Sequence, residues 1–246
     1  MMSFDQSGML PAAVVAVGFA LLARGLRAVT DGGAIAGAAV AFSLMLAGGW
    51  WPFLPLVMAF FLTLLATRWR AERKRSLGLA EQRNGRNSRQ IVANLGVAAL
   101  CALAAALFPV RFTGLMAAAM AAIAEAAADT VSSEVGQALP GQPRLIIGLT
   151  SVPHGTNGAI SLEGSLAGCI AASLIAWTAA LCGVVPWGWA PILAFAGVAG
   201  MLFDSVLGAL LENRGKLGND AVNFVSTIFA ADLVLLATLF LARHGA

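Results

Sequence analysis

Hydrophobic and polar positions divide the chain into long apolar windows separated by short polar segments. A helix needs about 17–25 apolar residues to cross a bilayer, and about eight windows approach this length. The second window is short, and the fifth reaches its length only by including the acidic stretch "AEAAADTVSSEVG" (124–136). We therefore predict an all-α polytopic membrane protein with about eight transmembrane helices in a single domain, 1–246. The windows are 9–28, 32–48, 50–67, 90–109, 112–135, 163–185, 190–211 and 221–242.

The composition supports this interpretation, because only 11% of the 246 residues are charged and 59% are hydrophobic. Soluble domains carry about 25% charged residues. The three cysteines, Cys101, Cys169 and Cys182, lie in apolar windows without CxxC spacing, so we expect neither disulfides nor a zinc site. The net charge of +3 comes from basic residues beside membrane segments. This placement favours membrane lipids as partners, and no nucleic acid is expected.

Lysine and arginine residues fall on one side of the predicted membrane. Of the 15 in the chain, only Arg111 and Arg243 fall on the other side. Because positive charge is retained in the cytoplasm, both termini are predicted to be extracytoplasmic, in the bacterial inner membrane. A basic loop (68–89) and a Gly-rich loop (136–162) then share the cytoplasmic face with the other polar stretches. We therefore expect the functional site at the cytoplasmic face.

Carboxylates inside apolar helices need a specific explanation, since a charged acid at the bilayer centre costs about 2.5–3.5 kcal/mol. Glu125 and Asp129 are four residues apart and share a helical face, whereas Glu134 lies about 140° around the helix from Asp129. Mg²⁺ prefers oxygen ligands, often one or two carboxylates together with substrate phosphates. Asp129 and Glu134 are therefore candidate Mg²⁺ ligands, and Asp204 and Asp220 are further candidates. The alternative is a structural role, in which these acids pair with arginine at the interface.

The stretch "VPHGTNGAISLEG" (152–164) combines glycines with hydroxyl and amide side chains immediately before an apolar window. Glycine lets backbone N–H groups approach a phosphate, and the N-terminus of the following helix adds a positive dipole end. We therefore predict that residues 155–158 bind phosphate, helped by Arg86 and Arg89. The alternative is an ordinary connecting loop.

Two further stretches mix charged and amide side chains, namely "GLAEQRNGRNSRQIVANLG" (78–96) and "GNDAVNF" (218–224). Arginine binds phosphate oxygens through paired hydrogen bonds. Topology alone would explain a basic loop, but the polar residues in it are too varied for a simple charge anchor. A helix N-cap explains either Asn219 or Asp220 equally well. The predicted substrate- and phosphate-binding residues are Glu81, Arg86, Arg89, Asn94, Arg144, Gly155, Thr156, Asn157, Gly158, Glu163, Asn219 and Asn223.

Four motifs in order resemble the integral-membrane family of phytyl-phosphate kinase, whose bacterial members mostly carry only the label domain of unknown function ninety-two. The motifs are "GLAEQRNGRNSRQIVANLGVAAL", "ADTVSSEVG", "PRLI" with "VPHGTNGAISLEGSLAG", and "FDSVLGALLE" with "GNDAVNF". The resemblance covers nearly the whole chain and implies transfer of a terminal phosphate from a nucleoside triphosphate, CTP or ATP, to an isoprenyl monophosphate. We expect Asp129, Glu134 and Asp204 to be catalytic and Asp129, Glu134 and Asp220 to bind Mg²⁺.

Other functions fit part of the pattern. The motifs are weakly similar to membrane CTP-dependent polyprenol kinases and phosphatidate cytidylyltransferases, so cytidylyl transfer is one alternative. A transporter or flippase of lipid phosphates would use the same arginines and acids without a nucleotide. A scaffold of a membrane complex would need none of these polar stretches. A channel or alternating-access carrier would show polar residues at mid-membrane and on both sides, whereas here they lie on one face.

Overall fold

The computed structural model of the chain describes residues 6–79 and 85–244. In these residues, long helices occupy all the predicted windows. Seven helical segments are long and apolar enough to cross a membrane, and one further apolar helix, α3, has only 16 residues. The prediction of an all-α membrane protein is confirmed. The second window, described above as short, forms the 18-residue helix α2, and the shortest of these helices is α3 in the third window. The long helices are α1 (Gln6–Gly25), α2 (Asp31–Gly48), α3 (Phe53–Arg68), α5 (Ser88–Leu107), α6 (Phe112–Ala138), α7 (Leu162–Leu181), α8 (Ala190–Leu207) and α9 (Asn219–His244).

Short elements join the long helices. The basic loop contains a helix that the apolar windows did not predict, α4 (Ala71–Ser76). The Gly-rich loop contains two antiparallel strands, β1 (Arg144–Leu145) and β2 (Ala159–Ile160). Helix α8 continues into the π-helical turn η3 (Gly208–Glu212). The 3-10 turns η1 (Pro109–Arg111) and η2 (Trp187–Trp189) lead into α6 and α8.

Helix α6 forms the core of the molecule and packs against α3, α5, α7, α8 and α9. Every residue from Met116 to Ala124 is fully buried, and most of them are alanine. Small side chains let helix backbones approach closely, and this close packing drives helix association in lipid. Gly197 of α8 continues the pattern, because a Cβ there would lie 3.0 Å from the Cβ of Ala124. The Ala-rich sequence of α6 therefore explains its central position.

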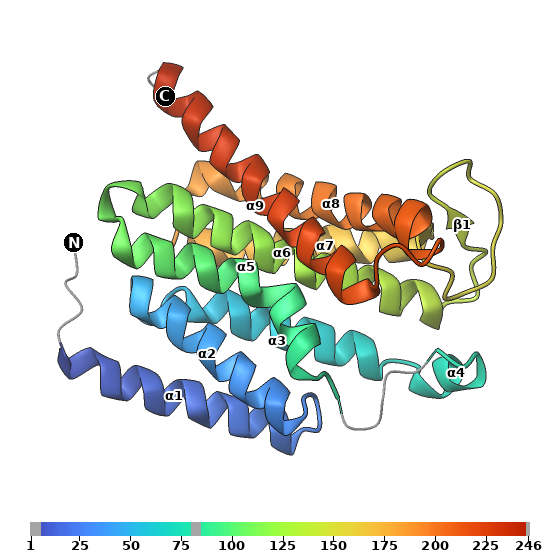
Figure 1. Ribbon diagram of the computed structural model, residues 1–246, viewed down its shortest axis with the longest axis horizontal. Helices are drawn as coiled ribbons and strands as arrows, with labels where there is room; N and C mark the ends of the chain where they lie inside the picture. Colours follow the sequence, from blue (N-terminus) through green and yellow to red (C-terminus); the bar gives the residue numbers. More distant parts are fainter. Residues whose placement is uncertain (1–5, 80–84, 245–246) are drawn as a thin grey trace.

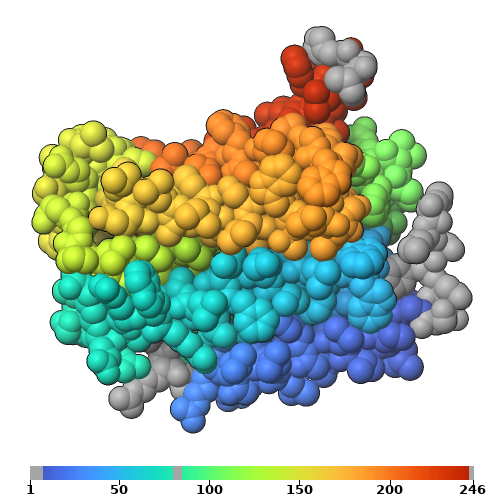
Figure 2. Space-filling model, turned by 180° about the vertical axis from the view of Figure 1, so that it is seen from behind, coloured from blue at the N-terminus to red at the C-terminus, as the bar shows by residue number. Residues whose placement is uncertain are grey.

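The helices are stacked in layers whose order follows the order of the sequence. In Figure 2, seen from behind, the N-terminal helices (blue to cyan) lie below the later ones (yellow to orange). Figure 1 shows α4, β1 and the start of α5 at one end of the bundle, whereas α1 begins and α9 ends at the other. The basic loop and the Gly-rich loop thus share one end, which we call the polar end. That this end faces the cytoplasm stays a prediction.

Candidate functional site

Two glycines bring Arg86 against the turn between α1 and α2. The backbone N–H of Arg86 donates to Ala28 O at 3.0 Å, and Thr30 N donates to Arg86 O at 3.0 Å. A Cβ at Gly33 would collide with the carbonyl oxygen of Arg86. Gly85 has a φ of 77° and faces the backbone of Ala28 at equally close range. Only glycine fits these contacts, so both residues serve to place Arg86.

A capping box then starts α5 directly after Arg86. Gln90 N donates to Asn87 Oδ1 at 3.1 Å, and Asn87 N donates to Gln90 Oε1 at 2.9 Å. One turn later, Asn94 is buried and donates from Nδ2 to Gln90 O at 2.8 Å. Its Oδ1 accepts from Asn223 Nδ2 of α9 at 3.4 Å. The capping box satisfies the first free N–H groups of the helix, and the amide contacts hold α5 beside α9.

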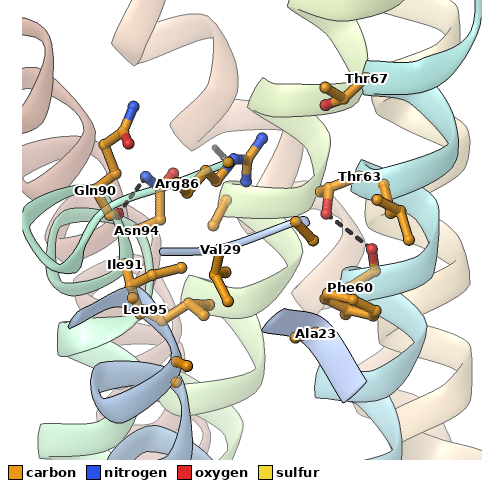
Figure 3. A pocket seen from close by; sticks show the side chains of 18 of the residues that line it. Ala23, Val29, Phe60, Thr63, Thr67, Arg86, Gln90, Ile91, Asn94 and Leu95 are labelled. Atoms are coloured by element: carbon orange, nitrogen blue, oxygen red, sulfur yellow. Dashed lines mark hydrogen bonds between the residues drawn. The ribbon is translucent and has the colours of Figure 1, made fainter. Parts of the chain in front are cut away.

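A cavity of about 580 Å³ lies between α1, α2, α3, α5 and α6. Figure 3 shows Thr63 and Thr67 of α3 facing residues of α5 across it, with Arg86 at the same polar end. Its volume is within the range of ligand pockets, about 300–1,000 Å³. The apolar lining is Phe19, Ala20, Ala23, Ala28, Val29, Gly33, Ala34, Gly37, Leu56, Ala59, Phe60, Leu64, Ala71, Gly85, Ile91, Leu95, Ile123, Ala126 and Ala127, and the polar lining is Arg27, Thr63, Thr67, Arg68, Lys74, Arg75, Arg86, Gln90 and Asn94.

A second, polar pocket of about 150 Å³ adjoins this cavity. Arg86, Gln90 and Asn94 line both spaces, so their side chains form a common wall. The apolar cavity and the polar pocket therefore meet at three hydrogen-bonding side chains, all from the stretch 78–96. The remaining lining of the polar pocket is Asp129, Thr130, Ser133, Glu134, Asn219 and Asn223.

Glu134 is held by an ion pair. Its Oε2 pairs with Lys74 of α4, and its Oε1 accepts from Thr67 Oγ1 at 2.9 Å. Lys74 is 1% exposed and also donates to Ala66 O at 3.0 Å and Thr67 O at 2.7 Å. Glu134 therefore has the structural role considered above, in which an acid pairs with a basic residue, although its partner is lysine and not arginine. Lys74 was not a predicted site residue, because it stands in a run of basic residues that the charge rule already explains.

Asp129 is among the residues that line the polar pocket, whereas Asp204 is not. Asp129 lines the pocket and interacts electrostatically with Arg86 and with Glu212. Asp204 of α8 accepts from Ser226 Oγ at 3.0 Å, and the same hydroxyl lies 2.9 Å from Asn223 O. Asp204 therefore contacts α9 one turn from Asn223, which lines the pocket.

Glu125 lies one helical turn from Asp129, deeper in the bundle. It is 1% exposed and packs against Gly200 of α8, where a Cβ would lie 2.5 Å from Glu125 Cγ. Its Oε1 has no hydrogen-bond partner among the described residues. Within the same part of the chain, no three His, Cys, Asp or Glu side chains are grouped to hold a metal ion by themselves.

The residues of the Gly-rich loop that we predicted to bind phosphate pack against other segments. Gly155, with φ 82°, faces the side chain of Leu79, and Gly158, with φ 75°, faces the backbone at the junction of α8 and η3. The carbonyl of Asn157 accepts from Asn213 Nδ2 at 2.8 Å. Thr156 Oγ1 donates to Pro153 O at 2.8 Å. None of residues 155–158 is among those lining the polar pocket.

Three more predicted residues lie away from the common wall. Arg89 is exposed in the first turn of α5. Arg144 of β1 is exposed and donates to Leu149 O at 3.2 Å. Glu163 is exposed in the first turn of α7, and its carboxylate lies near Gly141. Each of the three therefore lies at the surface near its own helix or strand, and none lines the polar pocket.

The predicted residues of the "GNDAVNF" motif separate at the start of α9. Helix α9 begins at Asn219, which lines the polar pocket together with Asn223. Asp220 lies in the first turn of α9 and is not among the lining residues. Glu81 lies outside the described residues.

Comparisons with known proteins agree with this architecture. The family model described as integral membrane protein DUF92 matches residues 14–231. An uncharacterized membrane protein of Synechocystis sp. is 34% identical over 76% of this chain and 74% of its own length. One of Methanocaldococcus jannaschii is 33% identical over 85% of each chain. The chloroplastic protein VTE6 of Arabidopsis thaliana is 28% identical over 78% of this chain and 60% of its own length.

No solved structure gives a significant match to the chain. The family match, in contrast, spans most of the described helices, from within α1 to within α9, and includes every residue of the common wall. The chain therefore belongs to the integral membrane protein DUF92 family.

Proposed function

We propose that this protein transfers the terminal phosphate of a nucleoside triphosphate to an isoprenyl, phytyl-like monophosphate, and so makes the diphosphate. The main support for this proposal is the common wall of Arg86, Gln90 and Asn94, where an apolar cavity meets an acidic polar pocket. An apolar chain and a phosphate joined in one molecule need these two environments side by side. The four motifs that resemble the phytyl-phosphate kinase family support the same reaction.

The acceptor would place its hydrocarbon tail in the cavity and its phosphate at the common wall. Burial of apolar surface contributes roughly 25 cal/mol per Å², so the cavity supplies most of the affinity for the tail. Arg86 presents a planar, permanently charged group that matches two phosphate oxygens. Its backbone is held by hydrogen bonds to Ala28 and Thr30, which keeps the headgroup at a constant depth.

The donor would bring its phosphates to the polar pocket. At about 150 Å³ this pocket is smaller than a typical ligand site, so it fits phosphates and leaves the nucleoside outside. An oxygen of the acceptor phosphate bonds to the terminal phosphorus while the bridging bond to the nucleotide breaks, and the nucleoside diphosphate leaves. Thr130, Ser133 and Asn219 line the pocket and supply neutral donors. Such transfer depends mainly on positioning and on charge neutralisation.

The lining of the polar pocket is suited to Mg²⁺ that arrives bound to the donor phosphates. This ion commonly takes one or two carboxylates and completes its shell with phosphate oxygens and water, and Asp129 lines the pocket where those phosphates would lie. When bound, Mg²⁺ would neutralise charge on the transferring group. Asp129 is the ligand we propose, because both oxygens of Glu134 already have partners.

The polar end would then face the cytoplasm, since the donor is a water-soluble nucleotide found there. In a bacterium, the protein would then lie in the inner membrane with both termini outside. Helix α4, which carries Arg73, Lys74 and Arg75, lies at this end of the bundle (Figure 1), and this agrees with the retention of positive charge on the cytoplasmic side.

Isotope labelling of purified protein tests the proposal directly. The protein is incubated with an isoprenyl monophosphate, Mg²⁺ and CTP or ATP labelled in either the α- or the γ-phosphate. We expect γ-label in a prenyl diphosphate and no α-label in lipid. Transfer of α-label would indicate a cytidylyltransferase. Absence of both labels, with exchange of prenyl phosphate across vesicles, would indicate a carrier and contradict the proposal.

A further inference from the structure

The lining of the cavity changes from polar to apolar along α3. Thr67 and Thr63 line the polar end, and Phe60 and Leu56 follow toward the middle of the bundle. The distance along the helix axis from Thr67 to Leu56 is about 16 Å. A tail that begins at the common wall therefore extends past Phe60 toward Leu56.

Packed side chains border the far end of this path. Leu56 is 5% exposed, and Ile123 of the central helix is fully buried. Phe19 of α1 meets Phe53 and Phe60 edge to face, with ring centroids 5.2 and 5.0 Å apart. Interiors of this density resist added volume, and an extra methylene in a packed core commonly costs about 1–3 kcal/mol.

We propose that Leu56, Phe60 and Ile123 set the longest isoprenyl tail that the protein accepts. The inference rests on the proposed function, because it takes the cavity as the site of the acceptor tail. A tail that ends before Leu56 leaves the packing undisturbed, whereas one more isoprenyl unit must displace it. Gly37 of α2 lines the same cavity, and a Cβ added there meets no atom within 4 Å. A larger side chain at this position would therefore occupy part of the cavity and leave less room for the tail.

Binding of tails of increasing length to purified protein, without nucleotide, tests the inference. The probes are labelled farnesyl, geranylgeranyl and geranylfarnesyl monophosphate. Leu56→Ala should improve the Kd of the tail one unit longer than the wild-type optimum by about tenfold, the scale of discrimination in apolar pockets. Leu54→Ala removes the same atoms from the exposed side of α3 and should leave every Kd within about twofold.

Gly37→Leu provides the opposite change and does not depend on the stability of Leu56→Ala. It should weaken the longest accepted tail by about tenfold and shift the preference toward shorter tails. Gly18→Leu, on an open part of α1, is its control. An unchanged length profile in both cavity variants would overturn the inference even if phosphate transfer is observed. Shifted binding without transfer would support the tail site and contradict the kinase. No binding of any prenyl phosphate to the wild type would contradict both.

Discussion

The cavity and the polar pocket share one wall but are held in different ways. Apolar side chains such as Phe19 and Leu56 line most of the cavity, and packing determines the shape of this apolar part. In the polar pocket, by contrast, specific hydrogen bonds or an ion pair orient several lining groups. Glu134 contacts Lys74 and Thr67, and Asn94 contacts Asn223.

This difference predicts how each region responds to substitution. Packing tolerates exchanges that keep volume, so the cavity should change its preference gradually. A buried polar group that loses its partner costs about 1–3 kcal/mol, and a charged group costs more. In the polar pocket, replacing a single polar or charged atom should therefore be enough to reduce activity or stability. Each of the following substitutions tests one side of the comparison or the wall between them.

The largest effect is expected from Asp129→Asn, which removes a charge from the polar pocket at nearly constant shape. If Asp129 holds Mg²⁺ with the donor phosphates, the rate of phosphate transfer should fall by about a thousandfold, as when charge stabilisation in an active site is lost. The Kd of the prenyl monophosphate should not rise by more than about threefold, because the cavity is unchanged and Arg86 only loses a negative neighbour. Single-turnover transfer of γ-label measures the first, and nucleotide-free binding the second.

Glu72→Gln, on the exposed side of α4, is the control for loss of a negative charge at the polar end. Wild-type transfer by Asp129→Asn at low Mg²⁺ would remove Asp129 from the site. A matching loss of prenyl-phosphate binding would mean that the two regions are not separable as proposed.

The next effect concerns stability. Lys74→Met leaves Glu134, whose side chain is only 15% exposed, without its cation, and breaking a buried pair from one side costs about 3 kcal/mol. The double variant Lys74→Met/Glu134→Gln should recover much of this loss, because no uncompensated charge remains. Recovery should be incomplete, since Lys74 also bonds two carbonyls near the end of α3. Denaturant unfolding in detergent measures both, and equal losses in single and double variants would argue against a mutual pair.

A third substitution tests the wall itself. Gly33→Ala adds a Cβ that collides with the carbonyl oxygen of Arg86, so the arginine must move relative to both regions. The KM values of nucleotide and prenyl phosphate should both rise, by about tenfold. Gly18→Ala in α1 meets no neighbouring atom and controls for the loss of a helical glycine. A change in only one of the two KM values would show that Arg86 serves one substrate alone.

Periodicity and composition were sufficient to predict the long helices, because a bilayer requires apolar segments of defined length. Helix α6 shows why even its acidic part was included correctly, since Asp129 and Glu134 continue the helix that the alanines begin. Helix α4 was missed because six residues rich in charge have no apolar period. The exact positions of close approach, such as Gly33 against Arg86, depend on segments distant in the chain.

The site was predictable only in part for the same reason. Arg86, Asn94, Asp129, Glu134, Asn219 and Asn223 were predicted, and the structure gathers them around one pocket. Lys74 pairs with a residue 60 positions away, and nothing local distinguishes it from its basic neighbours. Six of the described helices, α1 to α6, contribute residues to the cavity, so its existence depends on packing that no single window encodes.

The smallest effect is expected in the Gly-rich loop, where Thr156→Ala removes the hydroxyl that bonds Pro153 O. This bond closes a local turn away from the polar pocket, so kcat and both KM values should stay within about threefold. Gly158→Ala should matter more, because its Cβ would press on the backbone where α8 joins η3, the helix that carries Asp204. If the loop instead binds phosphate, as its sequence predicts, Thr156→Ala would raise the nucleotide KM by tenfold or more. Steady-state kinetics of the two variants therefore decide whether the loop belongs to the polar pocket or only supports it.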